Sequence, residues 1–220
     1  MMTQAAATMA AYTLSTASPH IAPDLGVENE DVAQLVAIVY FMGALSAMTV
    51  PPFIRRFGGM AVSMAICTAT AVMVSIAAVA SSMTMLALGA VALGCLYGAT
   101  APSSSFLLAR LAPPKRRNLV FSIRQIGVPL GGILGGVLVP PLILAGGWRM
   151  AFEAQLVFVL LLIFALYLVR HRYDRTPEFG QRLFDIKAPL RLFALLRELP
   201  ELRPLAIASA IYSGAQLCFG

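Results

Sequence analysis

The sequence predicts an all-α polytopic membrane protein. Hydrophobic residues make up 59% of the chain and charged residues only 12%, whereas a soluble domain carries about 25% charged residues. Apolar segments long enough to cross a bilayer recur along the chain, and the short gaps between them alternate between acidic and basic. Each apolar run is far longer than the roughly 9–11 residues of a barrel strand, so the spans are predicted to be helices.

The apolar runs define the expected domains. A helix that crosses the hydrocarbon core needs about 20 mostly apolar residues. We therefore expect residues 1–170 to form a six-helix bundle, 171–203 a cytoplasmic linker with an amphipathic stretch at 190–199 that can lie on the membrane surface, and 204–220 the start of a truncated seventh helix. The six complete spans are expected at 3–21, 32–52, 60–80, 83–109, 119–144 and 150–169.

The charges in the gaps predict the orientation in the membrane. The gap after the first span carries four acidic residues and no Lys or Arg, whereas the gaps after the second, fourth and sixth spans are basic. Because Lys and Arg are retained on the cytoplasmic side, the N-terminus is expected to be cytoplasmic, in a multi-pass protein of the inner or plasma membrane. The net charge of +6 could suggest nucleic acid, but the basic residues flank spans, so the lipid bilayer is the expected partner.

Polar side chains form stripes along the first, fourth and seventh spans. In the first span they recur every three or four residues, which places them on one helix face. Polar groups in lipid are costly, so these faces are expected to point toward the bundle interior or a water-filled substrate pathway. The alternative is that the Ser and Thr hydroxyls bond back to their own helices. The candidate pathway residues are Gln4, Thr8, Tyr12, Tyr97, Ser104, Tyr212 and Gln216.

Other spans carry packing signals. Gly94 and Gly98 in the fourth span have the small-xxx-small spacing that lets helix backbones approach closely. The fifth span is also rich in glycine. The sixth span is almost entirely apolar after Gln155, so it is expected at the lipid-facing periphery.

Two segments resemble each other within the chain. Val50-Pro51-Pro52 is followed by the glycine pair 58–59, and Val139-Pro140-Pro141 by the glycine pair 146–147. The charge pattern places these copies on opposite sides of the membrane, as an inverted three-plus-three repeat of a transporter requires.

Arg124 is an ionisable side chain inside the fifth span, with Gln125 beside it. Such a group is a functional candidate by default, and in a cavity it would attract an anionic solute. The alternative is that it reaches the headgroups or pairs with a loop carboxylate. Arg149 and Glu153, four residues apart at the start of the sixth span, are expected to form a structural ion pair.

Four segments together resemble the N-terminal half of a major facilitator superfamily transporter, over nearly the whole chain. The implied fold is the six-helix N-terminal bundle with its inverted 3+3 repeat. The resemblance also implies a missing C-terminal half, so the chain is expected to be a fragment, a truncated product or one piece of a split pair. The segments are residues 22–27, 53–59, 122–132 and 147–152.

Two departures from the family pattern bear on mechanism. The family's loop after the second span reads Gly-x-x-x-Asp-Arg-x-Gly-Arg-Arg. Here Arg56 and Gly58 match it, but Arg55 replaces the acidic residue, so the cytoplasmic gating loop is altered. The fourth span also lacks, at 90–93, the Arg that proton antiporters of the family tend to carry.

The expected function is secondary transport of a small organic solute by alternating access, with import favoured over export. Within the spans there is no paired-carboxylate site, metal-ligand spacing or nucleotide loop, so neither an enzyme nor a cofactor is predicted. The alternatives are drug or metabolite efflux within the same superfamily, and a non-transporting six-span subunit.

Overall fold

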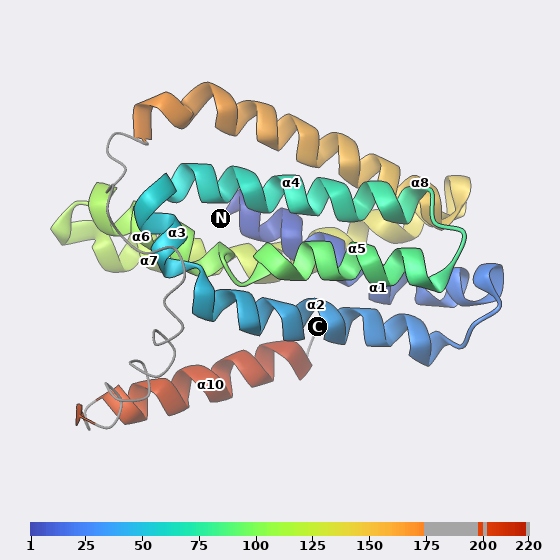
Figure 1. Ribbon diagram of the computed structural model, residues 1–220, viewed down its shortest axis with the longest axis horizontal. Coiled ribbons are helices and arrows are strands. Elements are labelled where there is room, and N and C mark those ends of the chain that lie inside the picture. The colour runs from blue at the N-terminus through green and yellow to red at the C-terminus, as the bar shows by residue number, and fades with distance from the viewer. Residues whose placement is uncertain (174–197, 200–201, 219–220) are drawn as a thin grey trace.

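The computed structural model describes residues 1–173, 198–199 and 202–218, and every regular element named in those ranges is a helix. The predicted linker, including its amphipathic stretch, lies almost entirely outside the described residues. In chain order (Figure 1) the helices are α1 (Met2–Leu25), α2 (Asn29–Thr49), α3 (Pro51–Phe57), α4 (Gly59–Ala78), α5 (Met83–Tyr97), α6 (Thr100–Leu111), the 3-10 turn η1 (Pro114–Arg116), α7 (Arg117–Gln125), α8 (Gly127–Tyr173) and α10 (Leu202–Cys218).

Four helical stretches in the described residues are long and apolar enough to cross a membrane: Asn29–Thr49, Gly59–Ala78, Met83–Leu111 and Pro114–Arg170. The last has 57 residues, and one crossing needs only about 20. The polar stripe of α1 lowers its hydropathy, so α1 is not among them. Its alanine-rich faces are nevertheless fully buried by other helices, as at Ala7 and Ala10.

The long helix α8 reverses direction at Gly146 and Gly147. Gly147 has a φ of 82°, which a residue with a side chain rarely adopts. Before the turn, Gly127 lies beside Met1 and Gly131 beside Ala5. After the turn the order runs backwards along α1: Trp148 meets Asp24, Gln155 meets Thr13 and Val159 packs with Ala6. The first arm therefore runs parallel to α1 and the second arm antiparallel to it.

Two of the expected spans are each divided into two helices. The span predicted at 83–109 is divided at Gly98 and Ala99 into α5 and α6, and that predicted at 119–144 is divided at Ile126 into α7 and the first arm of α8. A proline follows each break, Pro102 and Pro129. Proline has no N–H to donate to the carbonyl four residues earlier but is tolerated in the first turn of a helix.

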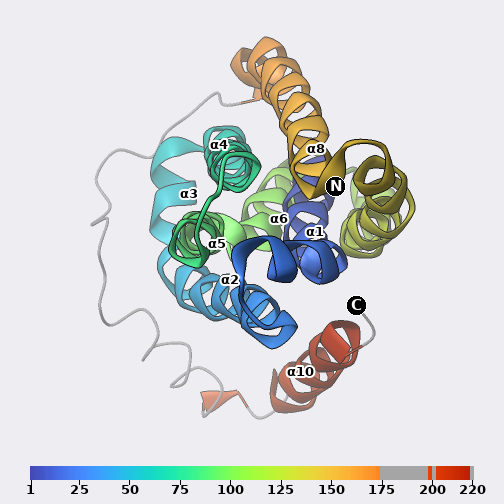
Figure 2. The same ribbon diagram turned by 90° about the vertical axis from the view of Figure 1, so that its right-hand side faces the viewer.

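Helix α1 forms the centre of the packing, and Figure 2 shows α2, α4, α6 and both arms of α8 around it. Gln155 of the second arm donates a hydrogen bond to the Thr13 hydroxyl, which donates to the Met9 carbonyl at 2.9 Å. On that arm Gln155 and Val159 face inward, whereas Leu161 and Leu168 are more than half exposed. This placement agrees with a lipid-facing sixth span that still buries one face.

The alternating charges gather at two ends of the helix bundle. Gly59, directly after the basic helix α3, lies against Leu107 of α6, so the basic gaps at 55–56 and 110–117 lie at the same end. At the other end Asp24 meets Arg149 and, through it, the carbonyl of Ala80. The two proline-glycine copies lie at opposite ends, as an inverted repeat requires.

Candidate functional site

Tyrosine hydroxyls from three helices meet midway along the bundle. The Thr8 hydroxyl on α1 and the Tyr97 hydroxyl on α5 share a hydrogen bond of 3.2 Å. The ring of Tyr40 on α2 meets that of Tyr97 edge to face, with centroids 5.4 Å apart. Tyr40 also interacts with the hydroxyls of both Tyr97 and Tyr12. Thr8 is fully buried, whereas the three tyrosines are half-buried, so the cluster is partly accessible.

Sequence reasoning predicted three members of this polar cluster and missed Tyr40. The stripes on the first and fourth spans identified Thr8, Tyr12 and Tyr97. Tyr40 stands alone in an apolar stretch of α2, so no stripe marks it. The available signal was its type, because a phenol within a membrane span needs a hydrogen-bond partner.

The backbone beside Tyr97 is held by the α2–α5 crossing. Ser46 accepts a hydrogen bond from the Gly98 amide at 3.1 Å, and its hydroxyl contacts the carbonyl oxygens of Gly43 and Gly94 at 3.0 and 3.3 Å. A Cβ at Gly98 would overlap the Gly43 carbonyl oxygen. The close backbone approach predicted from the spacing of Gly94 and Gly98 is confirmed, and it fixes the end of α5 where Tyr97 stands.

Arg124 forms hydrogen bonds with α6, the second helix of the span expected at 83–109. Its Nη1 donates to the Ala101 carbonyl at 3.0 Å and to the Ser105 hydroxyl at 3.1 Å, and its Nη2 donates to Oε1 of Gln125 at 2.6 Å. Its Nε is buried without a hydrogen-bond partner, as is Oε1 of Gln4. The described contacts of Arg124 are therefore with α6 and Gln125, and a loop carboxylate is not among them.

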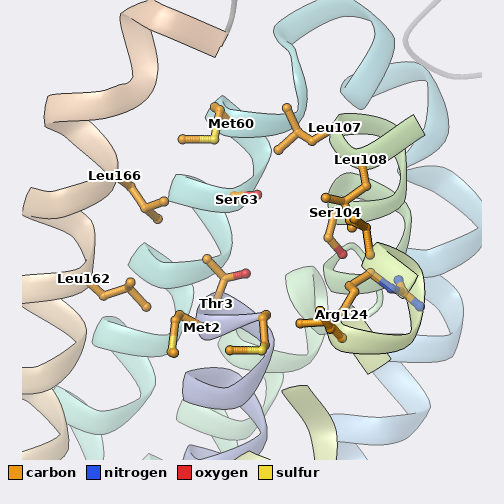
Figure 3. Close-up of a pocket in the computed structure, with 13 residues that line it drawn as sticks. Met2, Thr3, Met60, Ser63, Ser104, Leu107, Leu108, Arg124, Leu162 and Leu166 are labelled. Atoms are coloured by element: carbon orange, nitrogen blue, oxygen red, sulfur yellow. The ribbon is translucent and has the colours of Figure 1, made fainter. Parts of the chain in front are cut away.

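A cavity of about 320 Å³ lies at the basic end of the molecule (Figure 3). Its walls are mostly apolar, with Leu162 and Leu166 on one side and Leu107 on the other. Arg124 lines it too, but Figure 3 shows the guanidinium turned away from Leu162 and Leu166. Ser104 lines it and also donates to the Thr100 carbonyl at 2.6 Å. The Ser104 hydroxyl therefore bonds back to its own helix, which is the alternative to a role in the substrate pathway.

The other predicted pathway residues, Gln4, Tyr212 and Gln216, are not found in the polar cluster. Gln4 is buried near Gly127, toward the basic end. Tyr212 is half exposed on α10, which Figure 2 shows set apart from the other helices. The side chain of Gln216 lies outside the described residues.

The predicted gating loop forms the short helix α3 and the turn after it. Pro51 and Pro52 begin the helix, and Arg55 and Arg56 lie in its last turn. Basic residues there are favourable because the carbonyl end of a helix is partly negative. Gly58 ends the helix with a φ of 89°, a conformation that favours glycine. A gating role for these residues stays a prediction.

The predicted ion pair between Arg149 and Glu153 is replaced by a longer-range pair. Nη1 of Arg149 donates to Oδ2 of Asp24 at 2.7 Å, and Nη2 donates to the Ala80 carbonyl at 2.9 Å. Trp148 Nε1 also donates to Asp24, at 3.1 Å. These donors lower the pKa of Asp24, with the Arg149 bond the largest cause. Both partners of Asp24 therefore come from the start of the second arm of α8, and Arg149 links them to the residues that follow α4.

The described residues contain no group of three His, Cys, Asp or Glu side chains that could hold a metal ion. The polar cluster consists instead of hydroxyls and aromatic rings. Together with the apolar helices, these features define a multi-pass membrane protein with a polar interior face.

Comparison with known proteins identifies the family. The model of the Major Facilitator Superfamily matches residues 1–219. The chain therefore belongs to the major facilitator superfamily of membrane transporters.

Curated relatives include the purine ribonucleoside efflux pump NepI of Salmonella typhimurium and of Salmonella typhi. Each is 30% identical over 155 residues, which cover 65% of this chain and 36% of the relative. The chain thus matches about a third of the length of these relatives.

Solved structures show the same fold. The peptide transporter POT in complex with sulfate matches with a TM-score of 0.69 at 15% identity. The matched region covers 97% of this chain and 45% of the POT chain. A variant of POT in complex with alafosfalin has a TM-score of 0.68 at 14% identity, with 96% and 45% covered. At these identities the likeness concerns the fold alone.

Proposed function

We propose that this chain forms the N-terminal six-span half of a secondary transporter that moves a small organic solute by alternating access. The coverage of the POT structures, 97% of this chain but 45% of theirs, supports a partner half of similar size. In this proposal residues 1–170 are the six-helix bundle with its inverted repeat, 171–203 the cytoplasmic linker and 204–220 the start of the seventh helix. The two halves rock about a solute held between them.

The polar cluster of Thr8, Tyr12, Tyr40 and Tyr97 is the observation that carries the proposal. Hydroxyls inside a membrane protein are costly unless they serve a polar partner or a water-filled path. Three half-buried tyrosines on α1, α2 and α5 bring rings and hydroxyls together there. Such groups can stack on a solute and bond with it.

Transport by the complete transporter tests this role. Tyr97→Phe keeps the ring but removes the hydroxyl, and the loss of one hydrogen bond from that hydroxyl to the solute costs about 1 kcal/mol. We expect the KM for the transported solute to rise about five-fold while the amount of protein in the membrane stays constant. Tyr167→Phe is the matched control, because Tyr167 is 52% exposed on the second arm of α8. Equal KM values for Tyr97→Phe and wild type would contradict the proposal.

Arg124 distinguishes an anionic solute from a neutral one. Its hydrogen bonds go to neutral groups, the Ala101 carbonyl, the Ser105 hydroxyl and the Gln125 amide oxygen, so its positive charge has no carboxylate partner among them. If the solute is anionic, Arg124→Lys should keep part of the transport, whereas Arg124→Glu should abolish it, because Lys keeps the charge but loses the planar fork. Unchanged transport in Arg124→Glu would exclude an anionic solute bound there.

Efflux is the second candidate, and the NepI relatives favour it. NepI is an efflux pump for purine ribonucleosides, and a tyrosine-lined face suits a planar uncharged ring. Retention of labelled inosine in cells that lack their own exporters separates the two directions. Lower retention when the complete transporter is present supports efflux, and higher uptake supports import.

A further inference from the structure

A second cavity, of about 460 Å³, lies on the outer side of α3, α4 and α5. Its walls are almost wholly apolar: Thr49, Val50, Phe53, Phe57, Ala61, Val62, Ala65, Cys95 and Leu96. It shares none of these residues with the cavity at Arg124 or with the polar cluster. We call it the α3–α4 groove.

The groove runs from a charged end into the apolar part of the molecule. Phe57 ends α3, and Ala61 and Ala65 follow on one face of α4 at four-residue spacing. At about 1.5 Å per residue, the four steps from Ala61 to Ala65 extend roughly 6 Å along α4. The small side chains of Ala61 and Ala65 leave the room that the groove occupies.

Two arginines lie at the charged end of the groove. Arg55 is exposed, and the guanidinium of Arg56 lies 5.6 Å from the centroid of the Phe57 ring, which also stacks on Phe53 at 6.3 Å. No acidic residue occurs between Asp31 and Glu153. The groove therefore joins a positive rim to an apolar channel, which complements a molecule with an anionic head and a hydrocarbon tail.

We propose that the α3–α4 groove binds one anionic phospholipid, with its phosphate at Arg55 and Arg56 and an acyl chain along Ala61 and Ala65. Guanidinium groups bind phosphate through paired donors, and the tail removes Phe57 and Cys95 from exposure. A zwitterionic lipid fills the same channel but brings its own cation to the positive rim. The groove therefore selects phosphatidylglycerol over phosphatidylcholine.

Lipid retained by the full chain tests the proposal. The protein is reconstituted in mixed phosphatidylglycerol and phosphatidylcholine with identical acyl chains, extracted in mild detergent, and its bound lipid measured by native mass spectrometry. We expect phosphatidylglycerol to be enriched over its bulk fraction, and Arg56→Gln to reduce that enrichment about five-fold. Arg116→Gln is the matched control, because Arg116 is exposed at the same end but lies outside the groove.

A second variant separates the tail from the headgroup. Ala65→Leu fills the channel and should lower retention of both lipids, whereas Arg56→Gln lowers only the preference for the anionic one. Equal retention of the two lipids by wild type would overturn the proposal. So would an equal loss in Arg116→Gln, which would indicate general surface charge, or displacement of the lipid by inorganic phosphate, which would indicate a plain anion site.

Discussion

Asp24 joins three parts of the molecule through one carboxylate. It lies in the last turn of α1, takes hydrogen bonds from Trp148 and Arg149 at the start of the second arm of α8, and is linked through Arg149 to the Ala80 carbonyl. Arg149 also lies 4.2 Å from the centroid of the Trp148 ring. Sequence spacing indicated Glu153 as the partner of Arg149, because residues four apart share a helix face. Asp24 is 125 residues away in sequence, and only the reversal of α8 brings it near.

Asp24→Asn should lower the stability of the folded protein at neutral pH and flatten its response to acid. The Arg149 bond lowers the pKa of Asp24 in the folded protein. The stabilisation that ionised Asp24 contributes is therefore complete above its unfolded-state pKa of about 3.9, and it is lost as the pH falls through the lower folded-state pKa. Thermal unfolding in detergent between acid and neutral pH measures this. Glu153→Gln is the control and should leave the midpoint unchanged, whereas an equal effect of both variants would support the Glu153 pair.

The glycine-rich helices show what a sequence pattern can and cannot predict at the scale of elements. The spacing of Gly94 and Gly98 predicted close packing, and both glycines leave no room for a Cβ against α2. Gly131 lies equally close to α1, but a Cβ at Gly136 would meet nothing within 4 Å. Spacing identifies a helix that can pack closely. It does not say which of its glycines meets the partner, because that depends on how the helices rotate when they assemble.

Gly98→Ala should therefore destabilise the protein far more than Gly136→Ala. At Gly98 the added methyl group would overlap the Gly43 carbonyl, and forcing α2 and α5 apart costs about 1–3 kcal/mol or more. At Gly136 the space is open, and Ala is favoured over Gly inside a helix by up to about 1 kcal/mol. Unfolding by denaturant in mixed micelles compares the two variants. A comparable loss of stability in both would show that the α2–α5 contact is not as tight as described.

The apolar pattern predicted an all-helical chain with long apolar stretches, but it did not predict where those helices are interrupted. The reversal of α8 at Gly147 falls between the spans expected at 119–144 and 150–169. The breaks at Gly98 and Ile126 were not predicted, since hydropathy continues through both. Pro102 and Pro129 were the available local signals, but a proline in a membrane helix produces a kink in one context and a break in another. In the fourth span the break places Tyr97 at the end of α5, where the Ser46 hydroxyl accepts a hydrogen bond from the amide of Gly98.

The two charged ends of the whole molecule lead to a prediction of its orientation. The basic end carries Arg55, Arg56 and residues 110–117, and the acidic end carries Glu28 and Asp31. Since Lys and Arg in short loops stay on the cytoplasmic side, position 28 should face outward and position 116 inward. Both side chains are exposed, so each can be labelled.

Single-cysteine labelling of intact cells measures this orientation. In a chain whose three native cysteines are replaced by serine, Glu28→Cys should react with a charged, membrane-impermeant maleimide, whereas Arg116→Cys should react only after the cells are opened. Val159→Cys is the control for burial, since Val159 is 1% exposed among Ala6, Cys67 and Ala71 and should resist labelling in both conditions. Labelling of position 116 in intact cells, with protection of position 28, would show that the basic end faces outward and that charge does not set the orientation of this chain.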